Sequence, residues 1–589
     1  MADIIRDAPI GQLIRFITRN KVLQYPEEKP GFHLPESYNT ALNSSPIKEK
    51  LPISESPSDS DTSTINSTSS SDDLEAAAAS LARTKSREST QQWTDDRLQV
   101  ERELSLERSK SVPLAPIKTE DGNILVDWYT TDDPENPQNW SNLKRGSIAL
   151  IICLYTFAVY SGSAIYTSST LEVMHVFNVG ETAASLPLAL YVLAYGIGPL
   201  LFSPLSELPF VGRNPVYAVT FSLFFILSIP TALAKSFAGL LVLRFIQGFL
   251  GSPCLATGGA TMQDMYSMLK VPYAMTVWVA AAYCGPSLGP LLSGFAVPVE
   301  GWRWSLWEIV WISAPILIAM LLFLPETSTP NILLRRAARL RALTGSNRLM
   351  AHSEITQRNL RPTAIALDAL IKPLEITIKD PAIAFVNIYA SIVYAIYYSF
   401  FEVFPLVYGP MYGFSIGQTG VVFLCVLVAC VLGIAAYVSY LHFYLIPDIL
   451  AHGMRAQEHR LVPALICVFG PVIGLFVFAW TANPSIHWIV SVIGITIYAG
   501  SAFVVFQCIF VYVPMSYPHY AASLFASNDF FRSSLACAAI LFARPLFVNL
   551  GVARGTSLLG GLSVLGVLGM WGLWWWGARL RARSKFAVA

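Results

Sequence analysis

The residues best suited to chemistry are charged side chains that lie inside long apolar runs. Arg244 lies in the apolar run that starts near Phe237, and Glu402 lies in another such run. A charged group inside a membrane is costly, so it marks a functional site and needs a buried partner. We predict a functional role for Arg244 and proton binding for Glu402. The alternatives are an Arg244 that snorkels to the outer interface and a Glu402 that accepts a hydrogen bond at an outer gate.

Other polar and aromatic side chains in these runs predict a cavity. Aromatic walls with few fixed polar groups accept flat lipophilic molecules, although aromatics also face lipid or pack between helices. Asp529 and Arg532 lie three residues apart on one helical face, so we expect them to neutralise each other. The cavity candidates are Tyr195, Gln247, Tyr283, Asn387, Tyr394, Tyr398 and Gln507.

Two short motifs indicate special helix geometry. Glu207, Gly212 and Arg213 place an acid, a tight turn and a cation between two apolar runs. We interpret them as a cytosolic latch between helix ends, with a simple polar turn as the alternative. Another run carries two Gly-Pro pairs, in which glycine permits close helix approach and proline kinks the helix. These pairs are Gly285, Pro286, Gly289 and Pro290.

The elements that position these residues are predicted to be membrane-spanning helices. Apolar runs of about 20 residues have the length needed to cross a bilayer. Two sets of six, separated by a charged loop, predict an all-α membrane protein with twelve transmembrane helices in two six-helix halves. The predicted spans are 146–168, 183–205, 215–234, 237–260, 272–296, 305–324, 382–407, 415–440, 461–482, 485–512, 520–543 and 555–577.

The distribution of charge supports this fold class. Of 589 residues, 13% are charged, and residues 1–145 hold 41 of the 79 charged side chains. Soluble proteins carry about 25% charged residues, and a net charge of +1 provides no basic surface for nucleic acid. None of the eight cysteines lies in a metal-binding pair, and no GxxxxGK[ST] motif is present. We therefore predict no enzyme activity, cofactor, metal or nucleic-acid partner.

The predicted organisation has five parts. Lys and Arg concentrate in the segments that are inside if the N-terminus is inside, so both termini and the central loop are expected to be cytosolic. The parts are an N-terminal tail (1–125), a first half (126–325), a central loop (326–381), a second half (382–578) and a C-terminal tail (579–589).

The N-terminal tail is predicted to be mostly disordered, because residues 41–73 are rich in Ser, Thr, Pro and Asp. Within residues 8–20, Ile10, Leu13, Ile14 and Ile17 have the spacing of one helical face. This pattern favours an amphipathic helix that rests either on the membrane surface or on the protein's own cytosolic face.

Several motifs together resemble the major facilitator superfamily, and within it the fungal twelve-span drug:proton antiporters of the benomyl, methotrexate and fluconazole resistance type. The Glu207–Arg213 loop, Arg244-x-x-Gln247-Gly248 and the Gly-Pro repeat resemble family signatures. The resemblance implies that Arg244 takes part in proton coupling and that the Gly-Pro repeat belongs to an antiporter. Further matches are DPENPQNWS from Asp133, SGSAIYTSS from Ser161, LPETS from Leu324 and YYSFFEVFPLVY from Tyr397.

From this resemblance we expect a plasma-membrane monomer whose partners are a small lipophilic substrate, protons and the lipid bilayer. It would export drugs, fungicides or toxins in exchange for protons by alternating access. Alternatives are an exporter of an endogenous secondary metabolite or polyamine, a nutrient importer, and a transporter-like receptor that signals through its tail.

Overall fold

The computed structural model describes residues 2–43, 95, 97–99, 101–102, 111–119, 121–357, 362–517 and 520–587. Within these residues twelve helices are long and apolar enough to cross a membrane, which confirms the predicted fold class. The predicted disordered segment, residues 41–73, lies outside the described residues after residue 43.

The first half contains six spans, and several of them are broken into shorter helices. The short helix α8 (Glu181–Ala184) precedes the second span. The spans are α6 (Asn142–Ala164) continued by η3 (Ile165–Ser169) and α7 (Thr170–Phe177); α9 (Leu186–Glu207); α10 (Arg213–Ala232); α11 (Phe237–Gly251) with α12 (Pro253–Met265); α13 (Val271–Glu300); and α14 (Arg303–Phe323).

The second half repeats this arrangement after the connecting helix α17 (Pro362–Lys379). Its spans are α18 (Pro381–Tyr412); α19 (Ile416–Val422), α20 (Leu424–Tyr440), the π-helical turn η4 (Leu441–Leu445) and α21 (Ile446–His452); η5 (Gln457–Leu461), α22 (Val462–Cys467) and α23 (Phe469–Thr481); α24 (Trp488–Ser516); α25 (Ala521–Leu550); and α26 (Val552–Arg583).

Local residues fix the ends of these helices. The Asp380 carboxylate accepts hydrogen bonds from the first free amides of α18, those of Ala382 (3.0 Å) and Ile383 (3.4 Å). The same helix ends at Gly413, whose φ of +72° is readily adopted by glycine. The span that carries Glu402 therefore has defined limits at both ends.

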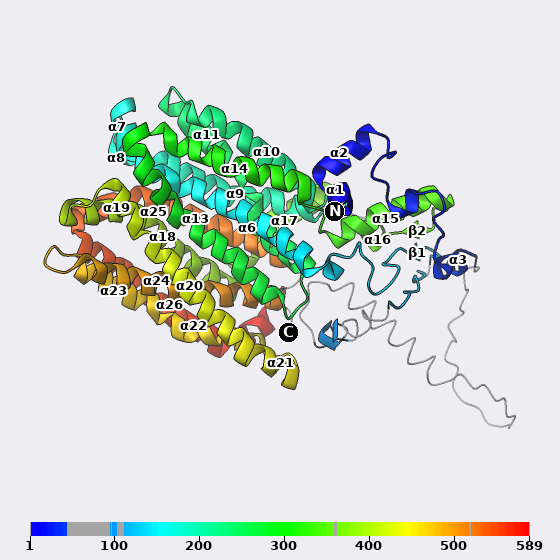
Figure 1. Cartoon of the computed structure of the whole chain (residues 1–589). Coiled ribbons are helices and arrows are strands. Elements are labelled where there is room, and N and C mark those ends of the chain that lie inside the picture. The colour runs from blue at the N-terminus through cyan, green and yellow to red at the C-terminus, as the bar shows by residue number, and fades with distance from the viewer. Residues whose placement is uncertain are drawn as a thin grey trace, which may run out of the picture.

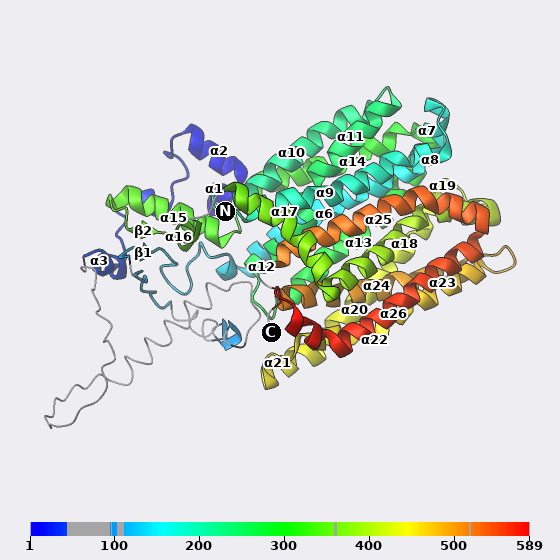
Figure 2. The same ribbon diagram turned by 180° about the vertical axis from the view of Figure 1, so that it is seen from behind.

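The two halves pack side by side along a long interface. Helix α9 lies along α25, and α13 lies along α19 and α20. Glycines permit this close approach: a Cβ on Gly196 of α9 would overlap Ser533 of α25, and one on Gly420 would lie 2.5 Å from the Pro290 carbonyl oxygen. Both chain ends lie at one end of the bundle, and α7, α8 and α19 lie at the other (Figures 1 and 2). We call these the terminal end and the opposite end.

A small folded unit, which we call the cap, covers part of the terminal end. Its strands β1 (Ile124–Leu125) and β2 (Leu349–Met350) form a parallel pair, with Ile124 opposite Leu349 and Leu125 opposite Met350. Its own apolar core includes Tyr38, Val126 and Leu340. The cap comprises residues 2–43, 111–135 and 329–357, with α1 (Ala2–Asp7), α2 (Pro9–Ile17), η1 (Pro26–Glu28), α3 (Glu36–Asn43), α15 (Thr329–Thr344) and α16 (His352–Gln357); η2 (Pro137–Asn139) leads from it into α6.

Helix α2 lies where the sequence places an amphipathic helix. It packs against α10 and α14, so it rests on the protein. Its apolar face is nevertheless open, because Phe16 is 82% exposed and Ile17 is 69% exposed. Arg15 points the other way and forms an ion pair with Glu28 at 2.7 Å.

Candidate functional site

A central pocket lies between the two halves. Aromatic side chains from α6, α13, α18, α24 and α25 form most of its wall. Two of the predicted cavity residues, Tyr283 and Tyr394, line this pocket. The other principal lining residues are Tyr160, Trp278, Pro286, Tyr397, Phe506, Phe510, Phe525, Asn528, Asp529 and Arg532.

The charged group of the central pocket is an ion pair on α25. Arg532 binds the Asp529 carboxylate, which is the pairing expected from their spacing. It also donates a 3.2 Å hydrogen bond to the Tyr160 hydroxyl of the other half. Its guanidinium lies 4.5 Å from the centre of the Tyr394 ring. The pair therefore faces the pocket and contacts both halves, a position that the sequence analysis did not foresee.

A group of hydroxyls closes the central pocket toward the opposite end, and we call it the hydroxyl seam. Tyr195 of the first half is 2.5 Å from the Tyr394 hydroxyl and 2.9 Å from the Tyr398 hydroxyl. Ser163 is 3.0 Å from Tyr398. All three contacts cross between the halves, so separation of the halves at this level would break them.

A second pocket lies at the opposite end, and we call it the vestibule. Glu402 lines it and accepts a 2.9 Å hydrogen bond from the Ser185 hydroxyl. Beside them Arg544 forms an ion pair with Glu181 at 2.5 Å. The first contact joins α18 of the second half to Ser185, which precedes α9 of the first half, and the second joins α25 to α8. Glu402 is thus a buried carboxyl group whose described hydrogen bond joins the two halves.

Arg244 is fully buried inside the first half, with an exposed fraction of 0%. It donates hydrogen bonds to the Gly162 carbonyl oxygen (2.8 Å) and the Gln247 amide oxygen (3.0 Å). Its guanidinium lies 4.2 Å from the centre of the Tyr191 ring. No carboxylate among the described residues forms an ion pair with it, so its partners are neutral. Arg244 does not snorkel to an interface.

Neighbouring side chains support Arg244 in this position. The centre of the Tyr166 ring lies 5.7 Å from the Arg244 guanidinium. Gln247, a predicted cavity residue, donates to Ser228 at 2.7 Å and so braces Arg244. The structure therefore places Gln247 in the support of Arg244 and outside the lining of the central pocket.

Asn387 lies toward the terminal end of the pathway. Its amide donates to Thr377 at 2.9 Å, and its oxygen accepts from Asn528 at 3.0 Å. Asn528 also lines the central pocket, so this amide pair continues the polar path toward the terminal end. Gln507 is fully buried, and its amide oxygen and nitrogen lack a hydrogen-bond partner in the described part of the chain.

The predicted latch involves different acids from the one expected. Arg213 binds Asp264 at 2.5 Å. Glu326 accepts hydrogen bonds from the backbone amides of Arg213 and Asn214, each at 3.1 Å. Among the described residues, none forms a hydrogen bond or an ion pair with the Glu207 side chain. Glu207, Arg213 and Asp264 belong to the first half, and Glu326 follows the last span of that half.

Two features of the latch require a glycine at position 212. Its backbone has a φ of +79°, and a Cβ there would overlap the Glu326 carboxylate. The sequence signal for the missed partners was present. Asp264 is an acid near the end of an apolar run, and Glu326 follows another run directly. A pairing across this separation in sequence becomes visible only when α10, α12 and α14 are placed together.

The Gly-Pro repeat lies where α13 packs closely against α6. A Cβ on Gly285 would lie 2.8 Å from the Tyr160 Cβ, and one on Gly289 would lie 2.8 Å from the Ile165 nitrogen. The prolines of the repeat face the two pockets: Pro286 lines the central pocket and Pro290 lines the vestibule. One stretch of α13 therefore borders both cavities.

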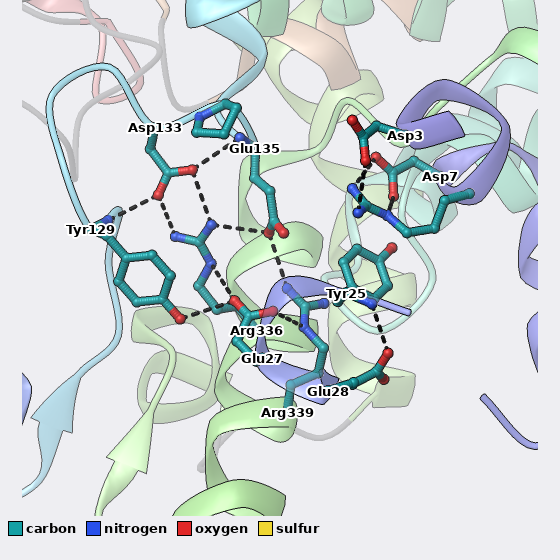
Figure 3. A network of polar contacts seen from close by, with 12 residues as sticks. Asp3, Asp7, Tyr25, Glu27, Glu28, Tyr129, Asp133, Glu135, Arg336 and Arg339 are labelled. Atoms are coloured by element: carbon teal, nitrogen blue, oxygen red, sulfur yellow. Dashed lines mark hydrogen bonds and ion pairs between the residues drawn. The ribbon is translucent and has the colours of Figure 1, made fainter. Parts of the chain in front are cut away.

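Outside the spans, an ion-pair network holds the cap together (Figure 3). Arg336 of α15 binds both oxygens of Asp133, at 2.7 and 3.1 Å, and contacts Glu135 at 3.0 Å. Arg339 joins Glu27 at 3.1 Å. Burial opposes ionisation of Asp133, but the hydrogen bonds and charge of Arg336 outweigh it and lower the pKa of this carboxyl group. The residues of this network lie far apart in the sequence, and it was not among the predicted features.

A family model, curated relatives and solved structures all match this chain. The family model described as Major Facilitator Superfamily matches residues 151–540. The chain is 42% identical to the MFS-type transporter pyvG of Aspergillus violaceofuscus and 36% identical to the cycloheximide resistance protein of Candida maltosa, with 100% of each pair of chains covered. Among solved structures, the proton:xylose symporter XylE matches with a TM-score of 0.51 at 14% identity, covering 74% of this chain and 96% of that one. The last match concerns the fold alone.

Proposed function

Because the chain belongs to the major facilitator superfamily, in the branch of fungal drug-resistance transporters, we propose that it exports lipophilic toxicants in exchange for protons by alternating access. The observation that carries this proposal is the central pocket between the halves. Its described wall is aromatic and its charges, Asp529 and Arg532, are paired with each other.

The wall of this pocket favours a substrate class. Aromatic faces bind flat apolar molecules by dispersion and burial, without demanding fixed hydrogen-bond geometry. The ion pair adds no net charge, so neutral and weakly charged lipophilic molecules are accommodated. Such a wall does not suit a strongly polar nutrient, which needs several placed hydrogen-bond partners.

We assign proton binding to Glu402, with Arg244 as the fixed cation that supports it. Glu402 can take up a proton without breaking an ion pair, because its described partner is the Ser185 hydroxyl. Protonation changes a charge-assisted hydrogen bond into a weaker neutral one. Since that bond joins the two halves at the opposite end, proton uptake loosens this contact.

The orientation that we propose places the terminal end in the cytosol and the protein in the plasma membrane, as a monomer. The Lys and Arg distribution supports this orientation. In it, the exposed apolar face of α2, with Leu13, Phe16 and Ile17, contacts the inner leaflet. The vestibule then opens toward the external medium, from which protons enter.

The test uses purified protein in liposomes loaded with rhodamine 6G, a lipophilic fluorescent dye, under an imposed pH gradient. We expect dye movement that is accelerated by the gradient and accompanied by proton movement in the opposite direction. An ionophore that collapses the gradient should abolish the acceleration, and empty liposomes control for dye leakage. Dye flux that is equal with and without the gradient would refute the proton exchange.

A further inference from the structure

A short helical segment of the N-terminal tail bridges the two halves at the terminal end. We call it the strap: residues 95, 97–99, 101 and 102, drawn as the short blue helix near the C label (Figures 1 and 2). Glu101 accepts a 2.8 Å hydrogen bond from the Met268 amide, in the loop between α12 and α13 of the first half. Asp95 accepts a 2.7 Å hydrogen bond from the Met454 amide, after α21 of the second half.

Further contacts fix the strap in this position. Arg102 donates to the Leu450 carbonyl oxygen of α21 at 3.2 Å. Leu98 is 4% exposed and belongs to the main apolar core of the bundle. Arg97 forms an ion pair with Glu101 at 3.0 Å, one helical turn away. The strap therefore combines an apolar anchor with charged hydrogen bonds to both halves.

The acceptors and donors of these bonds suit a contact that forms and breaks. Met268 and Met454 lie in loops, whose backbone amides are free to bind a side chain. A carboxylate that accepts from an amide gives a stronger hydrogen bond than a neutral acceptor. Asp95 also lies 2.9 Å from the position that a Cβ on Gly453 would occupy, so the glycine at that turn leaves room for the carboxylate.

We propose that the strap is an autoinhibitory contact that holds the terminal end closed and must leave one half whenever that end opens. The inference rests on the proposed alternating access, in which rocking of the halves separates the loops at one end. A segment bonded to both loops cannot keep both sets of contacts after this separation. The tail would thereby set how often the central pocket opens to the cytosol.

The first experiment measures opening directly, without substrate or gradient. Ser527 is buried near the terminal end of α25, and Ser527→Cys introduces a thiol there. Labelling by a membrane-impermeant maleimide is followed in nanodiscs, with the unaltered chain as the background for native cysteines. In the double variant Asp95→Asn/Glu101→Gln we expect labelling about tenfold faster, a factor that corresponds to about 1.4 kcal/mol.

The matched control is Glu36→Gln/Asp121→Asn, which removes the same charges from exposed positions of the cap. It should label at the rate of the unaltered chain. Equal labelling in the strap variant and this control would overturn the proposal. A strap variant that unfolds is recognised by size-exclusion chromatography, and Leu98→Ala then provides a second, milder release of the strap.

A second experiment asks whether the strap must move during transport. Cysteines at the paired positions 95 with 454 and 101 with 268 allow disulfides to both halves. We expect oxidation to stop rhodamine 6G transport and dithiothreitol to restore it. Full transport by the doubly crosslinked protein would overturn the proposal. If the unaltered chain shows no gradient-driven flux, the proposed function fails instead, and the labelling experiment still tests the strap.

Discussion

Two arginines, Arg244 and Arg532, are buried near the middle of the bundle. Their charges are stabilised by different kinds of partner. Arg244 is held by a carbonyl, an amide and an aromatic ring, and all of these groups belong to its own half. Arg532 is neutralised by Asp529 on its own helix and reaches across to Tyr160 in the other half.

This difference separates a fixed cation from an interface contact. The partners of Arg244 move with it when the halves rock, so its charge and surroundings persist through the cycle. The contacts of Arg532 change when Tyr160 moves away or when a molecule enters the central pocket. Arg244 therefore suits a constant electrostatic role, whereas Arg532 responds to the state of the pocket.

The largest effect is expected from Arg244→Ala. It removes two charged hydrogen bonds, each worth about 1.5–3 kcal/mol, so we expect gradient-driven dye transport to fall by at least about 100-fold. The protein should still reach the membrane, as measured by surface labelling. Arg244→Lys keeps the charge but loses the planar contacts and should recover part of the activity. Full transport by Arg244→Ala would remove this residue from the mechanism.

The second expected effect concerns the other arginine. Asp529→Asn leaves Arg532 as an unpaired buried cation, which costs about 3–5 kcal/mol. We expect a lower melting temperature in detergent and weaker transport of cationic dyes than of neutral ones. The double variant Asp529→Asn/Arg532→Gln removes both charges and should recover stability. If the double variant is as unstable as the single one, the pair does not act as the neutralised unit that distinguishes Arg532 from Arg244.

A third variant tests Glu402 of the vestibule as the proton site. Glu402→Gln keeps the shape of the side chain and the contact to Ser185 but cannot be protonated in the physiological range. We expect the pH gradient to lose its accelerating effect, which we estimate as about tenfold, equivalent to about 1.4 kcal/mol. Downhill dye movement should persist, with Ser185→Ala as the control for the lost hydrogen bond. Unchanged gradient dependence would transfer the proton site to another group.

The smallest effect on transport is expected at a third arginine, Arg336, which pairs with Asp133 in the cap. The pKa of Asp133 is lower in the folded protein than its ordinary value of 3.8. Its contribution to stability is therefore complete above pH 3.8 and is lost as the pH falls through the folded value. Asp133→Asn should lower the melting temperature at pH 7 and remove this acid-dependent loss, while the pH profile of transport stays unchanged. A shifted transport profile would show that the cap pair takes part in coupling.

The sequence predicts what is set by local composition. Runs of apolar residues identified all twelve spans, since length and hydropathy are properties of contiguous residues. It also identified Arg244 and Glu402 as exceptional charges. Pairings between distant segments were missed: Asp264 and Glu326 replace Glu207 around Arg213, because three helices must meet before the nearest acid is defined.

The position of a residue relative to a cavity was also beyond the sequence. Asp529 and Arg532 were expected to pair, but nothing in their spacing places them in the wall of the central pocket. Gln247, predicted to line the cavity, supports Arg244 instead. A helix has several polar faces, and the packing of its neighbours decides which face meets a pocket.

The pairing of β1 with β2 shortens the length of chain that is available to connect the two halves. The cap continues through α16 to Gln357, so the connection to the second half runs only from there to Pro381. Much of that length is the helix α17, which advances about 1.5 Å per residue where an extended chain advances about 3.3 Å. Along its helical part, the connection is therefore shorter than an extended chain of the same number of residues. A break between Gln357 and Pro362 would leave the whole cap on the first fragment, which makes this the natural position at which to divide the protein into two complementing chains.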